Sequence, residues 1–514
     1  MAPRTATTSL HHARRSRELS QLADGTVVDV LVVGLGVTGA GVALDAASRG
    51  LSVAAVDLAD LAFGTSRWSS KLVHGGLRYL ASLGVGVAYE CARERGILLT
   101  RTAPHLTRRL PVVLPLAGNV PRGTARLHRA GIAAGDLLRR AAGTPPALLP
   151  RSARISTEET LRLVPGLRRA GLRGGHLNWD GQLEDDARLV TAIARTAAGL
   201  GARIITRCRV RSLAGDRALV RDELGGGELT IRTRAVVNAA GVWADQLVDG
   251  ITLRPSRGTH LVLRAEDLGG LGAMLTVPVP DDRGRFVFAV PQPSGLVYVG
   301  LTDEPVDGPV EDVPAPPESD IGFLLAILGD ALEVAPTRAQ VVSAFAGLRP
   351  LLDDGRDRSA DVSRRHAVLS SADGVVTVVG GKLTTYRAMA QDAVDAAVRH
   401  RRLAAGPSRT RRLPLVGAAS RAELAGLHAP ARLVRRYGVE APAVAALAEQ
   451  DPGLAEPVAP GLDVTGVELV WALRHEGALT ADDLLDRRTR LGLVPADRAA
   501  ALPAAERLLT AYAP

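Results

Sequence analysis

The two lysines of this chain are the first residues whose chemistry stands out. Of its 63 lysine and arginine side chains only Lys71 and Lys382 are lysines, and they lie in the motifs SSKLVHGG (69–76) and GGKLTTY (380–386). An ammonium is a compact, strongly hydrated point charge that the planar guanidinium of arginine does not imitate. The two motifs therefore indicate places that require a compact positive charge, although two lysines left over by chance would look the same.

Other candidate chemical groups lie in similar glycine-flanked loops. Arg78, Arg349 and Lys382 each lie in a predicted glycine-flanked loop, where the backbone can approach a ligand. Arginine forks suit bidentate phosphate contacts, and a lysine adds a movable point charge. His260 is the best candidate for a base because histidine titrates near neutral pH. A lone histidine is more often structural, so from the residues alone both interpretations of His260 stay open, and His74 is a second candidate.

The elements that would position these groups begin with a dinucleotide-binding pattern. Residues 27–33 form a β-branched run typical of a buried strand, and GLGVTG follows at 34–39. A helical segment then ends at Gly50, and a second apolar strand ends in Asp57, 23 residues beyond the first glycine. In such a unit the glycines allow a tight turn and close approach to a pyrophosphate, and the acid accepts hydrogen bonds from ribose. The pattern predicts dinucleotide binding.

Two later strands favour FAD over NAD. Residues 234–241 and 374–382 are each a buried apolar strand that ends in small residues. FAD-binding two-dinucleotide folds return to the nucleotide sheet in this way after long insertions. Ordinary glycine-capped strands remain the alternative for the first of the two.

The segment GTSRWSSKLVHGGLRYL (64–80) resembles FAD-dependent, aerobic-type glycerol-3-phosphate dehydrogenases. The resemblance continues, in the same order, through DDARLV (185–190), NAAGVW (238–243), RGTH (257–260), GLRPL (347–351) and GKLTTYR (381–387). It covers residues 27–400 and, more weakly, the C-terminal part. It implies an α/β FAD-binding two-dinucleotide fold of the Rossmann-like, D-amino-acid-oxidase type, with an antiparallel-sheet substrate domain and a C-terminal helical domain.

The resemblance also implies roles for individual residues. The substrate site would be lined by Arg78, Tyr79, His260, Arg349 and Lys382, with His260, Arg349 and Arg78 as the catalytic group. His260 would be the base, and Arg349 could equally stabilise the developing alkoxide. FAD contacts are expected from Gly34, Gly36, Gly39, Asp57, Thr65, Ser66, Ser69, Ser70, Lys71, His74, Gly75, Gly76, Ala240, Gly241, Gly381, Lys382, Leu383 and Thr384. No metal is expected.

Some residues depart from the family's pattern. Arg67 and Trp68 are bulky where the family has smaller residues, and Leu301 replaces a hydroxyl-bearing residue. None of these changes removes a proposed phosphate ligand or the candidate base. Arg67 and Trp68 do lie in the expected flavin loop, where they bear on its local geometry.

Composition limits the cellular locations and the kinds of binding partner to be expected. The chain has 514 residues, a net charge of +9, and no apolar run of the roughly 18 residues that a membrane span needs. Nothing resembles a secretory signal, and Cys91 and Cys208 form no metal or redox spacing, which favours a cytoplasmic protein with buried thiols. With 3% aromatic residues and no zinc-finger or RNA-recognition motif, nucleic acid is the weakest explanation of the charge. A basic amphipathic helix predicted at 122–140 favours peripheral attachment to an anionic membrane, on the inner face of the cytoplasmic membrane.

The domain organisation follows from these segments. We expect a polar N-terminal tail at 1–26, an FAD-dependent oxidoreductase domain at 27–402 and a C-terminal helical domain at 408–514. Within the second, nucleotide-binding segments are expected at 27–110, 180–250 and 365–402, and a substrate-binding insertion of antiparallel strands at 251–362. A homodimer is left open.

The predicted function is oxidation of sn-glycerol 3-phosphate to dihydroxyacetone phosphate by hydride transfer from C2 to FAD, with a membrane quinone as electron acceptor. The nearest alternative is an oxidase that uses oxygen and produces hydrogen peroxide. An amine or amino-acid oxidase on the same fold would bind a carboxylate with one arginine and would not need three separated cations. A flavin-binding scaffold without turnover is the non-enzymatic alternative.

Overall fold

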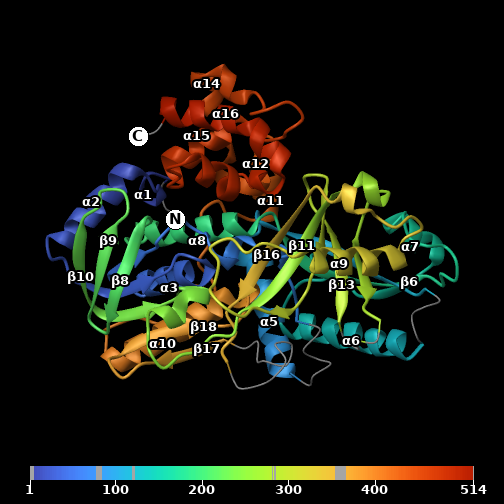
Figure 1. The fold of residues 1–514 in the computed structure, drawn as a ribbon, viewed down its shortest axis with the longest axis horizontal. Coiled ribbons are helices and arrows are strands. Elements are labelled where there is room, and N and C mark those ends of the chain that lie inside the picture. The colour runs from blue at the N-terminus through green and yellow to red at the C-terminus, as the bar shows by residue number, and fades with distance from the viewer. Residues whose placement is uncertain are drawn as a thin grey trace.

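The β-branched run near the N-terminus lies at the centre of a mostly parallel sheet. The structure, a computed structural model, describes residues 5–76, 84–117, 122–280, 282, 285–353 and 366–512 (Figure 1). Strand β1 (Val28–Val33) pairs in parallel with β2 (Val53–Val56) on one side and β10 (Glu228–Asn238) on the other. The order across this nucleotide sheet is β17 (Ala367–Ser370), β18 (Val375–Val379), β10, β1, β2 and β7 (Arg203–Ile205), and β10 also carries the hairpin of β8 (Cys208–Ala214) and β9 (Arg217–Asp222).

The nucleotide sheet is apolar on both faces because both are covered. Val30 and Val32 pack toward α3 (Val37–Ser48), α8 (Asp186–Gly199) and α10 (Tyr386–Arg401). Leu31 and Val33 point the opposite way, toward α2 (His12–Ala23). The alternation follows from the two-residue period of a strand.

A second, mainly antiparallel sheet lies beside the first (Figure 1). Its order is β15 (Glu304–Pro305), β11 (Ser256–Arg264), β14 (Leu296–Gly300), β13 (Phe286–Pro291), β12 (Met274–Pro278), β4 (Thr107–Pro115), β6 (Gly175–Leu183) and β3 (Leu72–Val73), with β16 (Ser343–Arg349) on β11 and β5 (Ala153–Ile155) on β6. This sheet extends beyond the predicted insertion at 251–362, because β12 continues in parallel onto β4 and thereby recruits strands from residues 72–183.

Strand β11 shows how the second sheet separates core from site. Leu261 and Leu263 pack against α9 (Glu318–Ala331), which covers one face. His260 and Val262 project from the other face, where Val262 packs with Phe345. The remaining described helices of this region are α5 (Val85–Ile97) with its π-helical extension η2 (Leu98–Thr102), α6 (Arg122–Ala141) and α7 (Thr157–Leu163).

The segment predicted as a polar tail folds into helices where it is described. Helices α1 (Thr5–Thr8) and α2 lie against the nucleotide sheet and the C-terminal domain (Figure 1). The Leu10 N–H donates to the His475 carbonyl over 3.0 Å, and the Gly477 N–H donates to the Leu10 carbonyl over 2.9 Å. Arg15 Nε donates to the Thr206 carbonyl over 2.7 Å. These contacts are made by backbone groups and arginine side chains. A polar composition therefore gave no indication that the segment packs against the rest of the protein.

The C-terminal helices have an apolar core of their own, centred on Trp471 and Leu469. They lie above the junction of the two sheets in Figure 1. The elements are α11 (Arg421–Ala425), α12 (Ala431–Tyr437), α13 (Ala441–Ala445), α14 (Leu447–Gln450), α15 (Gly466–His475), the π-helix η9 (Asp483–Arg488), η10 (Leu491–Leu493) and α16 (Pro495–Tyr512). Within the described ranges, no helix combines the length and the apolar character needed to cross a bilayer.

Candidate functional site

The turn from β1 to α3 has the tight geometry that its glycines predict. Gly34 has a φ of +98°, and a Cβ there would lie 2.6 Å from the Ala239 carbonyl oxygen. A Cβ at Gly39 would lie 1.8 Å from the Gly34 carbonyl oxygen, so only glycine lets α3 start this close to the strand. The turn also meets Ala239 and Ala240 after the end of β10, because parallel strands end at the same edge of the sheet.

Asp57 lies at the end of β2, beside this turn. Its carboxylate accepts hydrogen bonds from the Leu35 N–H over 2.6 Å and from the Ala59 N–H over 2.8 Å. Burial raises the pKa of Asp57 to about 6, against the lowering effect of these two hydrogen bonds. The carboxylate is thereby held at the position where dinucleotide folds bind ribose.

The segment that follows, residues 64–71, crosses to the second sheet. The Ser66 hydroxyl accepts a hydrogen bond from the Val37 N–H over 2.9 Å, at the N-terminus of α3. The Thr65 hydroxyl donates to the Leu348 carbonyl at the end of β16 over 2.6 Å. These two hydroxyls fix η1 (Thr65–Arg67) between the nucleotide turn and the strand that carries Arg349.

Lys71 is bound by a carboxylate from α8. Its ammonium donates to Asp186 Oδ1 over 2.7 Å and to the Arg67 carbonyl over 2.9 Å, and only 2% of its surface is exposed. Ser69 donates to the same carboxylate from its N–H and its hydroxyl. Burial alone would raise the pKa of Asp186, but the charges of Lys71 and Arg490 outweigh burial and lower it. The Lys71 ammonium is thus directed at the Asp186 carboxylate. Asp186 belongs to the motif DDARLV (185–190), but the sequence did not predict it as the partner of Lys71.

His260 is buried between Ser70 and Phe345. Its Nε2 lies 2.7 Å from the Ser70 hydroxyl, and its ring stacks on Phe345 with centroids 4.8 Å apart. Burial, followed by the charges of Lys71 and Arg349, lowers the pKa of His260 to about 3. A Cβ at Gly300, opposite His260 on β14, would lie 2.4 Å from the ring, so the strand pairing leaves room for the imidazole only with glycine there.

Arg349 ends β16 directly opposite Ser256 on β11. Its guanidinium donates to Ser256 Oγ over 3.1 Å, to Asp303 Oδ1 over 3.0 Å and to the Thr302 carbonyl over 3.2 Å. A Cβ at Gly258 would lie 2.5 Å from Nη2, which explains the glycine two residues before His260. The arginine is therefore fixed in one orientation, and the sequence did not predict its partners Ser256 and Asp303 as site residues.

Lys382 lies beside helix α5. It precedes the turn η6 (Leu383–Thr385), and its Nζ is 4.0 Å from Cys91 Sγ. A Cβ at Gly76 would lie 3.0 Å from the Cys91 Cβ, so Gly76 and Lys382 approach one buried thiol. Both cysteines are buried and unbonded to each other, as expected.

The remaining predicted residues complete the region. Gly75 donates its N–H to Asp180 Oδ1 over 3.0 Å, and a Cβ at this position would meet the Arg95 guanidinium at 2.4 Å. His74 lies next to Gly75 and is half-buried. Arg78 and Tyr79 lie outside the described residues. Among the described residues, no group of three or more His, Cys, Asp or Glu side chains is arranged to hold a metal ion.

These residues fit a bound FAD. Gly34 and Gly39 of the turn leave no space for a Cβ, and a carboxylate lies at the end of the second strand. On the far side, the Thr384 hydroxyl is buried without a hydrogen-bond partner among the described residues, beside Gly381 with its φ of +71°. A buried, unsatisfied hydroxyl next to a glycine turn suits a polar ligand.

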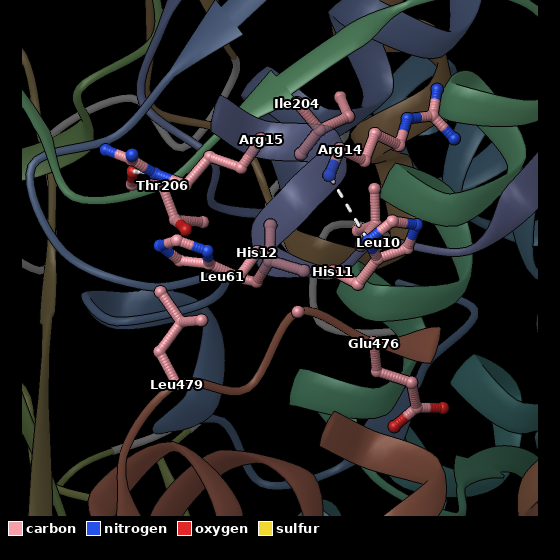
Figure 2. Close-up of a pocket in the computed structure, with 11 residues that line it drawn as sticks. Leu10, His11, His12, Arg14, Arg15, Leu61, Ile204, Thr206, Glu476 and Leu479 are labelled. Carbon is pink, nitrogen blue, oxygen red and sulfur yellow. Dashed lines mark hydrogen bonds between the residues drawn. The ribbon is translucent and has the colours of Figure 1, made fainter. Parts of the chain in front are cut away.

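A separate pocket lies where three regions of the chain meet. Figure 2 shows Leu10 and His11 from the N-terminal segment, Thr206 after β7, and Glu476 and Leu479 of the C-terminal domain around it. The charged groups there are already engaged, since Glu476 binds Arg188 and Arg15 binds the Thr206 carbonyl. This pocket contains none of the predicted site residues.

Two family models match the chain. One, described as FAD dependent oxidoreductase, matches residues 29–387. The other, described as the C-terminal domain of alpha-glycerophosphate oxidase, matches residues 408–513.

Individual proteins show the same similarity. Glycerol-3-phosphate dehydrogenase 1 of Mycobacterium tuberculosis is 52% identical over 98% of both chains. The solved structure of the Bacillus halodurans glycerol-3-phosphate dehydrogenase with FAD is 27% identical, with a TM-score of 0.73 over 98% of this chain and 94% of that one. L-alpha-glycerophosphate oxidase from Mycoplasma pneumoniae, 19% identical with a TM-score of 0.56 over 76% of this chain and 99% of its own, shares the fold. The predicted fold class, the family resemblance and FAD as cofactor are confirmed by these matches.

Proposed function

This chain belongs to the family of FAD-dependent glycerol-3-phosphate dehydrogenases, and on that premise we propose that it oxidises sn-glycerol 3-phosphate to dihydroxyacetone phosphate. A bound FAD supplies the hydride acceptor for such a reaction. The observation that carries the proposal is the grouping of a neutral buried histidine with an arginine, beside a glycine turn that fits the cofactor.

Phosphate binding is assigned to Arg349 and Lys382, together with Arg78. Arg349 presents a fork that is already oriented by Ser256 and Asp303, so little side-chain freedom remains to be lost on binding. Lys382 adds a point charge from the nucleotide side of the region. We place Tyr79 in the same substrate site, next to Arg78.

His260 is assigned as the base that takes the proton of the C2 hydroxyl. Because its pKa is lowered to about 3, the ring is neutral at physiological pH and has a lone pair to accept a proton. The Ser70 hydroxyl and the Phe345 ring hold the imidazole in one orientation. A phosphate dianion near Arg349 offsets one of the charges that lower this pKa, which makes His260 a stronger base once substrate is bound.

A quinone is proposed as the electron acceptor, with the protein attached peripherally to an anionic membrane. Support comes from α6, where Leu127 is 67% exposed and Leu137 is 66% exposed on the side that also carries exposed arginines. Exposed apolar side chains flanked by arginines are the features that place a helix in an anionic interface.

Anaerobic mixing of the FAD-loaded protein with glycerol 3-phosphate tests the proposal. Loss of the flavin absorbance in the visible range, together with dihydroxyacetone phosphate as product, is the expected result. Glycerol serves as the matched control, since it has the alcohol but lacks the phosphate that Arg349 and Lys382 would bind. A flavin that stays oxidised with glycerol 3-phosphate would contradict the proposed substrate.

The acceptor is decided by re-oxidation of the reduced protein. A water-soluble quinone analogue is expected to restore the absorbance much faster than air-saturated buffer does. Faster re-oxidation by oxygen, with formation of hydrogen peroxide, would instead identify the oxidase.

A further inference from the structure

A short segment of the C-terminal domain reaches the candidate site. Residues 490–494, here called the docking segment, follow the π-helix η9 and include η10. Arg490, its first residue, has a left-handed backbone with a φ of +67° and is 8% exposed, and its Nη1 donates to the Asp486 carbonyl within the C-terminal domain over 2.6 Å.

Arg490 contacts the flavin loop at its two bulky residues. Its Nη2 donates to the Arg67 carbonyl over 2.6 Å, and its guanidinium carbon lies 5.3 Å from the centre of the Trp68 ring. Its Nε forms an ion pair with Asp185 at 3.3 Å, without hydrogen-bond geometry. Two of the three residues that depart from the family's pattern, Arg67 and Trp68, therefore meet the C-terminal domain.

The position of the Arg67 carbonyl matters for both halves of the site. It also accepts the Lys71 ammonium, so two cations from different domains converge on one oxygen. The residue before it, Ser66, caps α3 at the nucleotide turn, and three residues after it Ser70 contacts His260. A shift of this carbonyl would move both hydroxyls together, because they belong to one short, tightly held loop.

The apolar residues of the docking segment support His260 through the ring of Phe345. Leu493 and Val494 are buried in one cluster with Tyr298 and Phe345, and Trp68 packs on it. Phe345 is the ring on which His260 stacks. Arg490 and this cluster thus support the two sides of the loop that carries Ser66 and Ser70.

We propose that the docking segment completes the active site, with Arg490 as a positioning residue that holds the loop of residues 65–71 in the geometry that binds FAD. The assignment rests on the proposed function only for the role of His260. The alternative is that Arg490 only holds the C-terminal domain against the rest of the protein. In that case its replacement would change the stability of the protein but not its affinity for FAD.

The substitution Arg490→Asn separates the two. Asparagine tolerates a left-handed backbone, so the change removes the guanidinium with little added strain. Fluorescence titration of the deflavinated protein is expected to give a dissociation constant for FAD about tenfold higher than that of wild type, the equivalent of one lost hydrogen bond to a charged group. Arg402→Asn is the backbone-matched control, since Arg402 is exposed with a φ of +52°, and it should bind FAD as wild type does.

A second control covers loss of stability. Arg432 pairs with Glu468 entirely within the C-terminal domain, so Arg432→Gln is expected to lower the midpoint of thermal unfolding without weakening FAD. In the proposed reaction, Arg490→Asn should lower kcat while KM for glycerol 3-phosphate stays within about twofold, because Arg349 and Lys382 lie on other elements.

Wild-type FAD affinity in Arg490→Asn would overturn the inference, whatever happens to turnover. If wild type binds FAD but leaves glycerol 3-phosphate untouched, the proposed function fails while the affinity comparison still decides the role of Arg490. Should Arg490→Asn yield no folded protein, the same titration on Arg490→Lys decides. Lysine keeps the charge but not the fork, so about threefold weaker binding supports the inference and unchanged binding overturns it.

Discussion

The charged side chains of this site have different surroundings. Lys71 is buried on Asp186, and the Lys382 Nζ lies 4.0 Å from the Cys91 Sγ. Arg349 is oriented by Ser256 and Asp303 at the edge of its sheet. Lys71 is therefore part of a buried ion pair, and the ligand contacts proposed for Lys382 and Arg349 are tested by substitution.

For Lys382→Ala we expect KM for glycerol 3-phosphate to rise about tenfold or more while FAD stays bound, because a hydrogen bond to a charged group is worth roughly 1.5–3 kcal/mol. Steady-state kinetics on the flavin-loaded variant measures this, with the exposed Arg402→Ala as control. An unchanged KM would remove Lys382 from the substrate site. Weaker FAD binding would assign it to the cofactor, the other role expected for it.

Buried histidines predict how stability depends on pH. Burial lowers the pKa of His105 to about 3 and that of His128 to about 4, so both are neutral in the folded protein at pH 5. In the unfolded chain they titrate near 6.5 and take up protons as the pH falls, so folding free energy is lost from about pH 6.5 downward. His105→Gln should reduce the loss between pH 6.5 and 4.5 by about 2 kcal/mol, measured by urea unfolding at both pH values.

The exposed His12→Gln provides the comparison, since it should leave the pH dependence as in wild type. A His105→Gln protein that loses stability as steeply as wild type would show that His105 is protonated in the folded state.

Among the elements, the segment of residues 64–76 links more parts of the site than any helix or strand described above. Ser66 binds the start of α3 and Thr65 the end of β16. Ser69 and Lys71 bind α8, and Ser70 binds β11. This segment has little regular structure because its polar groups are satisfied by neighbouring elements instead of by a helix or sheet of its own.

The tight turn between β1 and α3 predicts how a substitution there changes FAD affinity. Gly39→Ala would place a Cβ 1.8 Å from the Gly34 carbonyl oxygen, so α3 must move away from the strand. FAD affinity is expected to fall by about a hundredfold or more, because the pyrophosphate site is the start of this helix. The titration used for Arg490 measures it. Gly131→Ala on α6, where nothing lies within 4 Å, is the control and should leave FAD binding intact.

Helix α6 carries the proposed membrane contact. Replacing Leu127 and Leu137 together by serine should weaken binding to phosphatidylserine vesicles by about tenfold or more, since each leucine side chain contributes roughly 1.5–3 kcal/mol when buried. Vesicle co-sedimentation measures the change. Leu200→Ser, at the exposed end of α8, should bind like wild type. Equal binding by all three proteins would place the membrane contact elsewhere.

At the scale of the whole molecule, buried ion pairs connect regions that are far apart in the sequence. Asp60 of the nucleotide domain binds Arg488 and Arg487 of the C-terminal domain. Burial alone would raise the pKa of Asp60, but these two charges outweigh it and hold it well below the usual range. Glu476 of the C-terminal domain binds Arg188 on α8 in the same way. The domains are therefore joined by buried ion pairs, in which each charge is compensated by its partner.

Glu476→Gln tests this connection. Removing the carboxylate leaves Arg188 buried without its counter-charge, so we expect a loss of about 3–5 kcal/mol of unfolding free energy. Urea unfolding measures it. Glu318→Gln, which breaks the exposed pair with Arg338, should show no measurable change. If Glu476→Gln and Glu318→Gln changed the unfolding free energy equally, burial would not explain the contribution of the Glu476 ion pair.

The sequence determined the features that depend on neighbouring residues. The glycine turn at 34–39, the strand on each side of it and the acid at Asp57 follow from backbone sterics and strand burial within a few residues, and the structure places them as the spacing predicts. The helical C-terminal region follows from local periodicity in the same way. The family motifs around Ser70, His260 and Arg349 also identified a loop and two strands that the structure brings together.

Only the tertiary structure decided which of these residues meet. Asp186 is 115 residues from Lys71, Ser70 is 190 residues from His260, and Arg490 is 423 residues from the Arg67 carbonyl. No local rule predicts such pairs, because a buried charge or hydroxyl takes the partner that packing places beside it. The sheet that runs past its predicted boundary and the helices in the expected tail have the same cause: their contacts are made with distant segments, and local composition does not record them.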